Sequence, residues 1–329
     1  MSALVDRFGR VHTDLRVSLT DKCNLRCTYC MPAEGLDWLP SPDLLTDDEV
    51  VRLVGLAVTE LGITAVRLTG GEPLLRRGLV DIVSRLAELE PRPKLAVTTN
   101  GIGLARLAGD LAAAGLDRVN VSLDTLRPDR FREMTRRDRL DDVLAGLEAA
   151  AAAGLVPVKV NAVLMRGAND DEALDLLDFC LERGYQMRFI EQMPLDAQHS
   201  WTRADMVTGD ELLAALGARH TLTPLPGRGS APAEDFLVDD GPATVGVIAS
   251  VTKPFCAACD RVRLTADGQL RNCLFAREES DLRGPLRSGA TDTEIAARFR
   301  ASIAGKRAGH GIDDPTFLQP DRPMSAIGG

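Results

Sequence analysis

The fold of this chain is constrained most strongly by a regular alternation of strand-like and helix-like segments in its first 194 residues. Runs typical of β-strands occur at residues 14–20, 63–70, 94–101, 118–124, 157–165 and 186–194. Apolar residues at helical spacing lie between them, at residues 46–61, 79–89, 103–114, 140–153 and 170–183. Strands joined by helices form parallel sheets with right-handed crossovers. The alternation therefore predicts an α/β fold, as a partial TIM-type barrel of six βα units or as an open doubly wound sheet.

One face of the predicted sheet is polar along most of its strands. Successive residues of a strand point to opposite faces, so that Arg16 and Ser18 lie opposite Leu15 and Val17. Parallel strands buried on both faces would be almost continuously hydrophobic. We therefore predict a ligand cavity inside a curved sheet, which favours the partial (incomplete) TIM-type barrel. The polar face includes Arg16, Ser18, Arg67, Thr98, Asn120, Ser122, Lys159 and Asn161.

The pattern changes after about residue 195. Residues 223–234 are rich in proline, glycine, serine and alanine, which indicates a linker or crossover. Short strands are expected at 236–238, 243–251 and 261–264, then a hairpin turn at 266–269, a strand at 270–274 and a helix at 293–304. We divide the chain into a barrel domain, residues 1–222, and a β-containing C-terminal extension, residues 223–329, that closes the open side of the barrel.

The composition narrows the class of protein. The chain has 329 residues, 45% of them hydrophobic, and a formal net charge of -9. This acidic balance argues against nucleic-acid binding and against attachment to a membrane surface. No apolar run approaches the roughly 20 residues of a membrane span, and the N-terminus lacks the hydrophobic core of a secretory signal. We expect a cytoplasmic protein, and because that compartment is reducing, metal binding is favoured over disulfide formation for its cysteines.

Six of the seven cysteines form two separated triplets. The first has the spacing C-x3-C-x2-C and comprises Cys23, Cys27 and Cys30. The second has the spacing C-x2-C-x13-C and comprises Cys256, Cys259 and Cys273. Three thiolates leave one position open in the four-ligand shell of a [4Fe–4S] cluster or a zinc ion. The first triplet follows a predicted strand, at the sheet edge where βα folds gather their chemistry, and is a candidate catalytic site.

The residues alone leave zinc open at both triplets. A zinc site completed by a distant ligand such as His12 is an alternative for the first triplet. For the second triplet, read alone, zinc is favoured, since C-x2-C is a common zinc-binding hook. The seventh cysteine, Cys180, lies among leucines at helical spacing and is predicted to be a core residue.

The first triplet resembles the cluster motif of the radical S-adenosylmethionine (radical SAM) superfamily. An aromatic residue, Tyr29, precedes its last cysteine. The second predicted strand is followed by Thr69-Gly70-Gly71-Glu72-Pro73, which is similar to the glycine-rich loop of that superfamily. The resemblance implies a [4Fe–4S] cluster whose fourth iron chelates SAM. Glycines in such a loop let backbone groups approach the methionine amino group of the cofactor closely.

The C-terminal third narrows the resemblance to one family. The second triplet, the Arg261-Val262-Arg263 after its C-x2-C and the terminal Gly328-Gly329 are similar to the GTP 3′,8-cyclase family, also called molybdenum cofactor biosynthesis protein A. The resemblance implies a second [4Fe–4S] cluster, whose open iron contacts the guanine of GTP. Implied SAM contacts are Tyr29, Gly71, Ser122 and Met193. Implied GTP contacts are Arg16, Arg67, Thr98, Lys159, Arg261 and Arg263. The implied catalytic residues are Arg261, Arg263, Gly328 and Gly329, because the Gly-Gly tail reaches into the active site of relatives.

The positions of the cations favour an anionic ligand without reference to the family. Arg16, Arg67 and Lys159 lie on the polar sheet face, and Arg261 and Arg263 alternate onto one side of a strand. Guanidinium groups match phosphate oxygens well, whereas surface salt bridges are the alternative for each residue taken singly. One departure from the family is Ala65, where some relatives carry a lysine near GTP.

The resemblance also implies a reaction and its partners. GTP would be converted to (8S)-3′,8-cyclo-7,8-dihydroguanosine 5′-triphosphate in molybdenum cofactor biosynthesis, with electrons from a separate donor. A cyclic pyranopterin monophosphate synthase would take the product, and relatives suggest a homodimer. Two alternatives stay open: a radical SAM peptide-maturing enzyme with an auxiliary cluster, and a zinc-stabilised protein without enzymatic activity.

Overall fold

A 12-stranded sheet forms the centre of this computed structural model, which describes residues 3–328. The strand order is β14-β13-β12-β3-β4-β5-β6-β7-β8-β11-β10-β9. The six strands predicted from the alternation stand next to one another in sequence order and are all parallel. They are β3 (Asp14–Ser18), β4 (Ala65–Thr69), β5 (Lys94–Thr99), β6 (Arg118–Ser122), β7 (Lys159–Leu164) and β8 (Gln186–Glu191).

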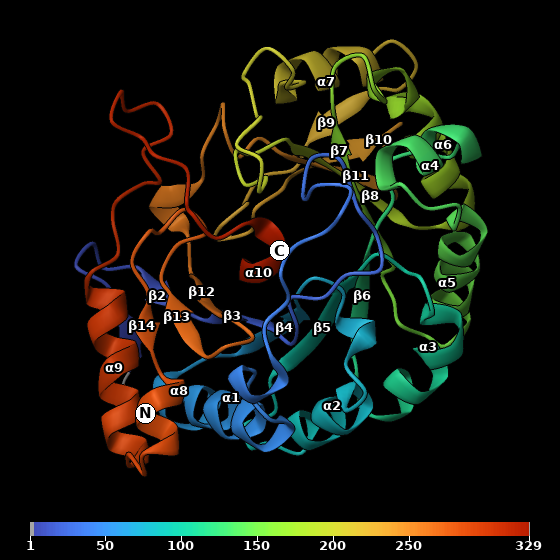
Figure 1. Cartoon of the computed structure of the whole chain (residues 1–329). Coiled ribbons are helices and arrows are strands. Elements are labelled where there is room, and N and C mark those ends of the chain that lie inside the picture. The colour runs from blue at the N-terminus through green and yellow to red at the C-terminus, as the bar shows by residue number, and fades with distance from the viewer. Residues whose placement is uncertain (1–2, 329) are drawn as a thin grey trace.

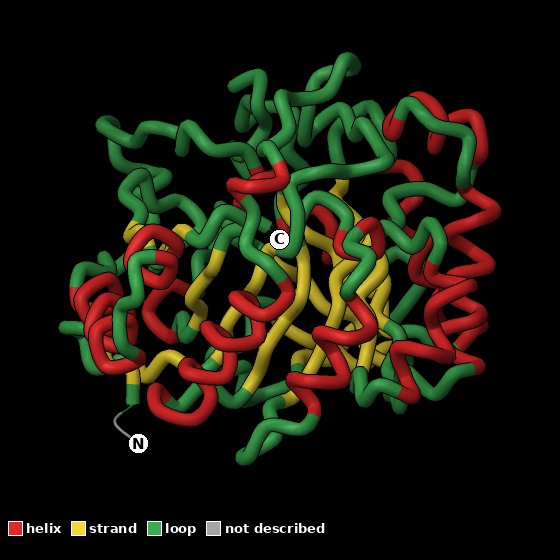
Figure 2. The backbone as a smooth tube through the Cα atoms, turned by 60° about the horizontal axis from the view of Figure 1, so that its bottom comes forward, coloured by secondary structure: helices red, strands yellow, loops and turns green. Residues whose placement is uncertain are grey.

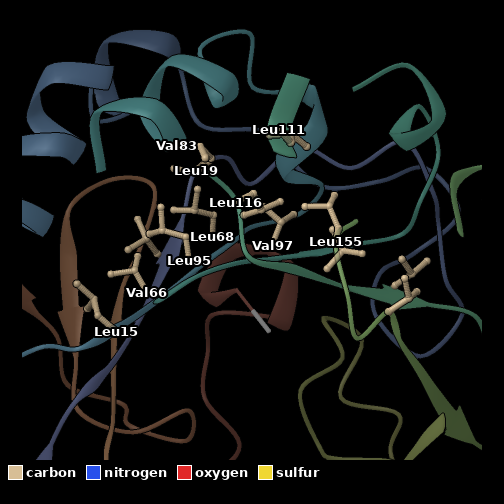
Figure 3. Packing of buried hydrophobic residues seen from close by; sticks show 14 of the residues in the cluster. Leu15, Leu19, Val66, Leu68, Val83, Leu95, Val97, Leu111, Leu116 and Leu155 are labelled. Carbon is tan, nitrogen blue, oxygen red and sulfur yellow. The ribbon is translucent and has the colours of Figure 1, made fainter. Parts of the chain in front are cut away.

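Helices cover the apolar face of this sheet and form an arc around its outside (Figure 1). They are α1 (Asp47–Leu61), α2 (Leu79–Ala87), α3 (Leu104–Ala113), α4 (Pro128–Thr135), α5 (Leu140–Ala152) and α6 (Ala173–Arg183). α1 begins at a capping box, in which the Thr46 side chain accepts from the Glu49 amide and the Glu49 side chain accepts in return. Figure 3 shows Leu15, Val66 and Leu95, from three neighbouring strands, packed together in the core. These six helices do not cover the opposite, polar face.

The C-terminal third extends the sheet at both of its edges. At one edge, β11 is parallel to β8 and is followed by β10 and β9; at the other, β12 is parallel to β3 and is followed by β13 and β14. These strands are β9 (Leu222–Pro224), β10 (Glu234–Val238), β11 (Thr244–Ile248), β12 (Arg261–Leu264), β13 (Gln269–Arg271) and β14 (Ser280–Asp281). The result is an α/β fold with one large mixed sheet, and the hairpin predicted at residues 266–269 is confirmed.

Several short elements were not predicted. The strand expected at residues 270–274 ends at Arg271, because that side chain donates to the carbonyls of Leu274 and Ala276 and turns the chain. The helix expected at 170–183 begins as a 3-10 turn and becomes α6 only at Ala173. The helix expected at 293–304 is confirmed as α9 (Asp292–Ala304). The remaining unpredicted helices and strands are β1 (Leu4–Val5), β2 (Val11–His12), β9, β14, α4, α7 (Gly209–Leu216), α8 (Arg283–Arg287) and α10 (Met324–Ile327). β9 lies partly in the segment expected as a linker, residues 223–234, because it pairs with β10.

Many of the long loops gather at one end of the strands, and the C-terminal segment lies among them (Figure 2). The six central strands finish at this end. The loop with the first cysteine triplet, for example, follows the last residue of β3 directly. Within residues 3–328, none of the helices has both the length and the apolar character needed to cross a membrane.

Candidate active site

A cavity of about 300 Å³ opens at the carboxyl ends of the central strands. The first cysteine triplet lines one part, which we call the cysteine end. Arg16, Arg67, Arg188, Arg261 and Arg263 line another part, which we call the arginine end. Each of β3 to β8, and β12, contributes to the wall, so the polar face predicted from strand alternation is the lining of a cavity. Other polar lining residues from these strands are Thr69, Thr98, Thr99, Ser122 and Asn161.

The first triplet lies in the loop that follows β3, and its three cysteines are half-buried. Burial raises the pKa of the Cys27 thiol well above its usual range and raises the pKa of Cys30 to about 12. Arg136 fixes the loop, since its Nη1 donates to the carbonyls of Arg26 at 3.0 Å and Met31 at 3.1 Å. Three soft sulfur donors on one short, anchored loop fit the ligand set of a [4Fe–4S] cluster with an open iron.

The glycine-rich loop after β4 packs against the cysteine loop through its backbone. The amide of Gly71 donates to the carbonyl of Thr20 at 2.7 Å, and the amide of Glu72 donates to that of Lys22 at 2.8 Å. A Cβ on Gly71 would lie 2.3 Å from the Lys22 carbonyl oxygen. Glycine at this position is therefore required by the contact between the two loops. The family resemblance implied a different reason, the close approach of backbone groups to the cofactor.

Glu72 connects this loop to the end of β5. Its carboxylate accepts from the Leu74 amide at 2.9 Å, the Thr99 hydroxyl at 2.7 Å and the Asn100 amide at 2.7 Å. Burial raises the pKa of Glu72 to about 7, although these hydrogen bonds act to lower it. The side chain of Asn100 donates to Asn24 Oδ1 at 2.7 Å. Glu72 thus supports the cysteine loop through Asn100, a role that the sequence did not reveal.

The other implied SAM contacts also line the cavity: Tyr29, Ser122 and Met193. The Tyr29 hydroxyl donates to Asp124 Oδ2 at 2.7 Å, and Asp124 Oδ1 accepts from the Val163 amide at 2.8 Å. Burial raises the pKa of Asp124 to about 6. Asp124 was not predicted as a site residue, because only the fold brings it to Tyr29.

Arginines of three neighbouring strands lie side by side at the arginine end. The register pairs Arg263 of β12 with Arg16 of β3, and Arg16 with Arg67 of β4. Arg16 and Arg263 are buried, and Arg67 is half-buried. Burial, followed by the charge of Arg16, lowers the pKa of Arg67 to about 9 and that of Arg263 well below its usual value. A buried row of like charges is electrostatically unfavourable unless an anion joins it.

Several guanidinium nitrogens at this end lack acceptors within the described part of the chain. Nε of Arg16, Arg67 and Arg188, and Nη2 of Arg261, are buried without a hydrogen-bond acceptor. The carboxylate of Asp14 lies only at the limit of an ion pair, 4.0 Å from Arg16. A buried donor without an acceptor costs about 1–3 kcal/mol. A ligand with several anionic oxygens would satisfy these donors together.

Two cations depart from the expected arrangement. Lys159 does not line the cavity; it is half-buried at the start of β7, where burial and then Arg188 and Arg118 lower its pKa to about 7. Arg188 does line the cavity but was not predicted. The mixed pattern of β8 hid it, and only its register with Asn161 of β7 shows which face it shares.

The second triplet lines an adjoining cavity of about 80 Å³. Cys256 and Cys259 precede β12 and Cys273 follows β13, so that the hairpin brings them together. Burial raises the pKa of the Cys259 thiol, but Arg261 and Lys306 outweigh it and lower that pKa to about 7. Three thiols on the wall of an open space fit the ligand set of a second cluster. The side chains shared by the two cavities are Met193, Ser250, Phe255, Arg261, Arg263 and Leu274.

Ligand sets for a single metal ion are absent from the described residues: no three His, Cys, Asp or Glu side chains in residues 3–328 are arranged to hold one. His12, the suggested zinc ligand, instead lies 3.3 Å from Asp6 Oδ2 and 3.4 Å from Lys306 Nζ. Cys180 is fully buried in α6, as predicted. All seven cysteines are free thiols.

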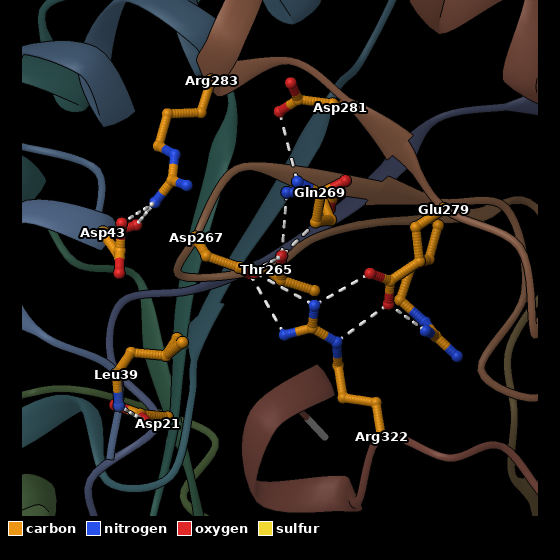
Figure 4. A network of polar contacts seen from close by, with 11 residues as sticks. Asp21, Leu39, Asp43, Thr265, Asp267, Gln269, Glu279, Asp281, Arg283 and Arg322 are labelled. Carbon is orange, nitrogen blue, oxygen red and sulfur yellow. Dashed lines mark hydrogen bonds and ion pairs between the residues drawn. The ribbon is translucent and has the colours of Figure 1, made fainter. Parts of the chain in front are cut away.

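The C-terminal segment is anchored to the turn of the β12–β13 hairpin and to the loop between β13 and β14. Arg322 Nη2 donates to Asp267 at 3.0 Å and to Glu279 at 2.8 Å (Figure 4). α10 follows this anchor, and Met324 and Ser325 from it line the main cavity.

Gly328 reaches the arginine end. Its carbonyl accepts a hydrogen bond from Arg263 Nη1 at 2.5 Å. Its φ is +88°, and a Cβ would lie 2.8 Å from Thr69 Cγ2, so the position requires glycine. The other implied tail residue, Gly329, lies outside the described residues.

Two family models match consecutive parts of the chain. The model described as Radical SAM superfamily matches residues 17–180, and the model described as Molybdenum Cofactor Synthesis C matches residues 185–312. A GTP 3′,8-cyclase of Streptomyces coelicolor is 69% identical, over 99% of this chain and 96% of that protein. A GTP 3′,8-cyclase of Mycobacterium sp. (strain KMS) is 65% identical, over 99% and 93%. GTP 3′,8-cyclase 2 of Mycobacterium tuberculosis (strain H37Rv) is 62% identical, over 99% and 92%.

Solved structures share the fold at much lower identity. Streptococcus suis SuiB bound to S-adenosylmethionine aligns with a TM-score of 0.60 and 14% identity, over 92% of this chain and 70% of that one. SuiB bound to the precursor peptide SuiA aligns with a TM-score of 0.59 and 15% identity, over 92% and 69%. These likenesses show the fold alone, since such low identity does not carry a substrate from one protein to another.

Proposed function

Because this chain belongs to the GTP 3′,8-cyclase family of radical SAM enzymes, we propose that its cavity holds SAM at the cysteine end and GTP at the arginine end. The activity is GTP 3′,8-cyclisation in molybdenum cofactor biosynthesis. The proposal adds two [4Fe–4S] clusters, one on Cys23, Cys27 and Cys30 and one on Cys256, Cys259 and Cys273. The product would be 3′,8-cyclo-7,8-dihydro-GTP.

The observation that carries the placement of GTP is the set of buried arginine donors without acceptors. Arg16, Arg67, Arg188 and Arg261 each bring at least one such donor to a single cavity. A triphosphate offers several anionic oxygens, and guanidinium groups bind such oxygens in pairs. Thr98 lines the same wall, and Lys159 adds charge from the same face of β7 as Asn161, two residues before it.

We also infer that the sheet is an incomplete TIM-type barrel of six βα units, closed by the C-terminal extension. The support is the pairing at the two edges of the six-strand set: β11 adds to β8 and β12 adds to β3. Both added strands belong to residues 223–329, so a barrel unit at 1–222 and a closing unit at 223–329 remain our division of the chain.

When bound, a cluster on Cys23, Cys27 and Cys30 would supply the one-electron chemistry with which SAM is cleaved and C3′ of GTP is joined to C8. The chain's own residues position and shield the reactants. Tyr29, Gly71, Ser122 and Met193 border the SAM side. Arg261 stacks on Phe255, 4.5 Å from the ring centre, and Arg263 holds the Gly328 carbonyl, so these residues border the nucleotide. Ile190, Ile248 and Phe255 limit the entry of water.

The partners follow from this chemistry. An electron donor must supply the reducing equivalents, and a cyclic pyranopterin monophosphate synthase would consume the product. A reducing, cytoplasmic setting is part of the proposal, because it would keep the six triplet cysteines available as cluster ligands, and the acidic charge gives no support to nucleic-acid or membrane binding. A homodimer is our working assumption.

The decisive experiment uses anaerobically reconstituted protein with dithionite, SAM and GTP. We expect 5′-deoxyadenosine and the cyclised nucleotide together, with about eight irons per chain. Cleavage of SAM without any cyclised nucleotide would reject GTP as the substrate. A peptide-maturing enzyme would instead modify a peptide, and a zinc protein would be colourless and hold zinc.

A further inference from the structure

The second cysteine triplet is supported from outside the cavity by the two ends of the chain. β1 and β2 pair as an antiparallel hairpin, with Leu4 opposite His12. Lys306, just after α9, lies beneath this hairpin with only 3% of its surface exposed. None of these residues lines either cavity. The active-site chemistry described above therefore does not account for them.

Lys306 is satisfied by three acceptors. Its Nζ lies 2.8 Å from the carbonyl of Arg261, 3.6 Å from Cys259 Sγ and 3.4 Å from His12 Nδ1. A lysine ammonium has three donors and no acceptor, so His12 Nδ1 must accept. The proton of a neutral His12 is then on Nε2, which donates to Asp6 Oδ2 at 3.3 Å. The position of the Lys306 side chain is thus determined by a buried chain of contacts.

Asp6 also orients a residue that contacts Cys256, the other cysteine of the C-x2-C segment. It accepts from Arg10 Nε at 2.5 Å. Arg10 Nη1 then donates to the carbonyl of Cys256 at 2.6 Å, and its Nη2 donates to that of Arg307 at 2.6 Å. One buried carboxylate therefore aligns a cation on each cysteine of the C-x2-C segment: a contact to sulfur at Cys259 and to the backbone at Cys256.

We propose that Lys306, oriented by His12 and Asp6, is a positioning residue of the second cluster that donates an N–H···S hydrogen bond to Cys259 and raises the reduction potential of that cluster. This inference rests on the proposed two-cluster function. Hydrogen bonds and positive charge at the sulfurs favour the reduced state of a cluster, which carries more negative charge. The donors that contact Cys23 Sγ in the first triplet are neutral: the Leu25 amide at 3.4 Å and Asn100 Nδ2 at 3.8 Å. The two triplets therefore differ in the charge of the groups at their sulfurs, and this proposal makes Lys306 one cause of a difference in potential between the clusters.

The test is a potentiometric titration of the full-length, reconstituted protein, followed by electron paramagnetic resonance. The same titration in Cys27→Ala, which lacks the first cluster, assigns the signal of the second. We expect Lys306→Met to shift the potential of the second cluster to more negative values and to leave the first unchanged. Lys306→Arg should return the potential of the second cluster most of the way to its wild-type value. The matched control is Lys253→Met, since Lys253 is exposed, pairs with Asp210 and precedes the same hook.

The outcomes separate this inference from the proposed function. About eight irons per chain with the same potential in Lys306→Met and Lys253→Met would overturn the role of Lys306. About four irons in the wild type would reject the second cluster itself, and the inference with it. If Lys306→Met fails to hold its second cluster and the wild type does hold it, the test uses His12→Leu instead. This substitution removes one acceptor of Lys306, and we expect the potential of the second cluster to shift to more negative values. An unshifted potential in His12→Leu would overturn the proposal.

Discussion

The two ends of the active-site cavity are stabilised in opposite ways. At the cysteine end, buried polar groups have partners: Tyr29 donates to Asp124, and Glu72 accepts three hydrogen bonds. At the arginine end, Arg16 and Arg67 are brought together with donors left without acceptors. The cysteine end is therefore complete as a scaffold before any reactant arrives. The arginine end would gain its stability from the anion that we propose it binds, because a ligand that binds only the folded state stabilises that state.

The largest effect is expected from Cys27→Ala at the cysteine end. Without one of three ligands the first cluster should not assemble, so the iron content falls from about eight to about four per chain. Cleavage of SAM and cyclisation of GTP should both be abolished, which the yields of 5′-deoxyadenosine and cyclised nucleotide measure. GTP affinity should stay within about twofold, since the arginine end is intact.

Cys180→Ala is the matched control, because Cys180 is buried in α6 away from both triplets. It should keep about eight irons and full activity. A Cys27→Ala protein that still cleaved SAM would contradict the assignment of the first triplet.

The next effect belongs to the arginine end. Arg261→Ala with Arg263→Ala should reduce cyclisation by more than about 100-fold, since several charge-assisted contacts of about 1.5–3 kcal/mol are lost together. Both clusters should still assemble, and SAM should still be cleaved. Product yield, GTP affinity and iron content separate these effects.

Arg139→Ala provides the control for loss of an arginine. Arg139 is exposed and pairs with Asp142 on the protein surface, where an ion pair contributes little. If the double variant bound GTP as tightly as the wild type, the arginine end would not be the nucleotide site.

Stability gives the sharpest contrast between the two ends. Glu72→Ala leaves the Leu74 amide, the Thr99 hydroxyl and the Asn100 amide without their acceptor, so the free energy of unfolding should fall by about 3 kcal/mol or more. Arg67→Ala removes a charge that repels Arg16, so the ligand-free protein should be as stable as the wild type or more stable. Thermal unfolding of the apoprotein compares the two variants.

The same melting experiment with GTP completes the contrast. GTP should raise the melting temperature of Glu72→Ala as it does that of the wild type, and should raise that of Arg67→Ala less. Equal destabilisation by both substitutions would show that the arginine end is an ordinary part of the core.

The sequence predicted these two ends to different degrees, for physical reasons. Arg16 and Arg67 could be assigned to the cavity because their strands alternate cleanly, and alternation is a local property. Arg188 could not, since apolar and polar residues occur on both faces of β8. The contact between Tyr29 and Asp124 joins residues 95 positions apart and depends on the order of strands. The same holds for Arg263 beside Arg16, which requires β12 to join the sheet at β3.

The unpredicted elements have a similar explanation. α4 has few apolar residues, so its periodicity is weak, and α10 and the β1–β2 hairpin are too short to show a period at all. Both α1 and α7 begin at capping boxes, at Thr46 with Glu49 and at Thr208 with Glu211, and the sequence pattern of a capping box is local.

The smallest predicted effect is a pH dependence of GTP binding that arises from Lys159, at the start of β7 and two residues before Asn161. Its pKa is lowered to about 7 by burial and by Arg188 and Arg118, so its ammonium is charged below pH 7 and largely neutral above it. A bound triphosphate favours the charged form and raises this pKa. GTP binding should therefore take up a proton above pH 7, and affinity should fall by at most about tenfold per pH unit as the pH rises.

Isothermal titration calorimetry measures this proton uptake directly, from binding enthalpies in buffers with different enthalpies of ionisation. Lys159→Arg should bind GTP well without the uptake, because an arginine stays charged, whereas Lys159→Met should bind more weakly and also without it. The phosphates of GTP titrate alike in all three proteins, so their contribution cancels in the comparison. An unchanged proton uptake in Lys159→Met would assign the titration to another group. Lys159 would then not contribute to GTP binding, and only the residues that line the cavity would form the arginine end.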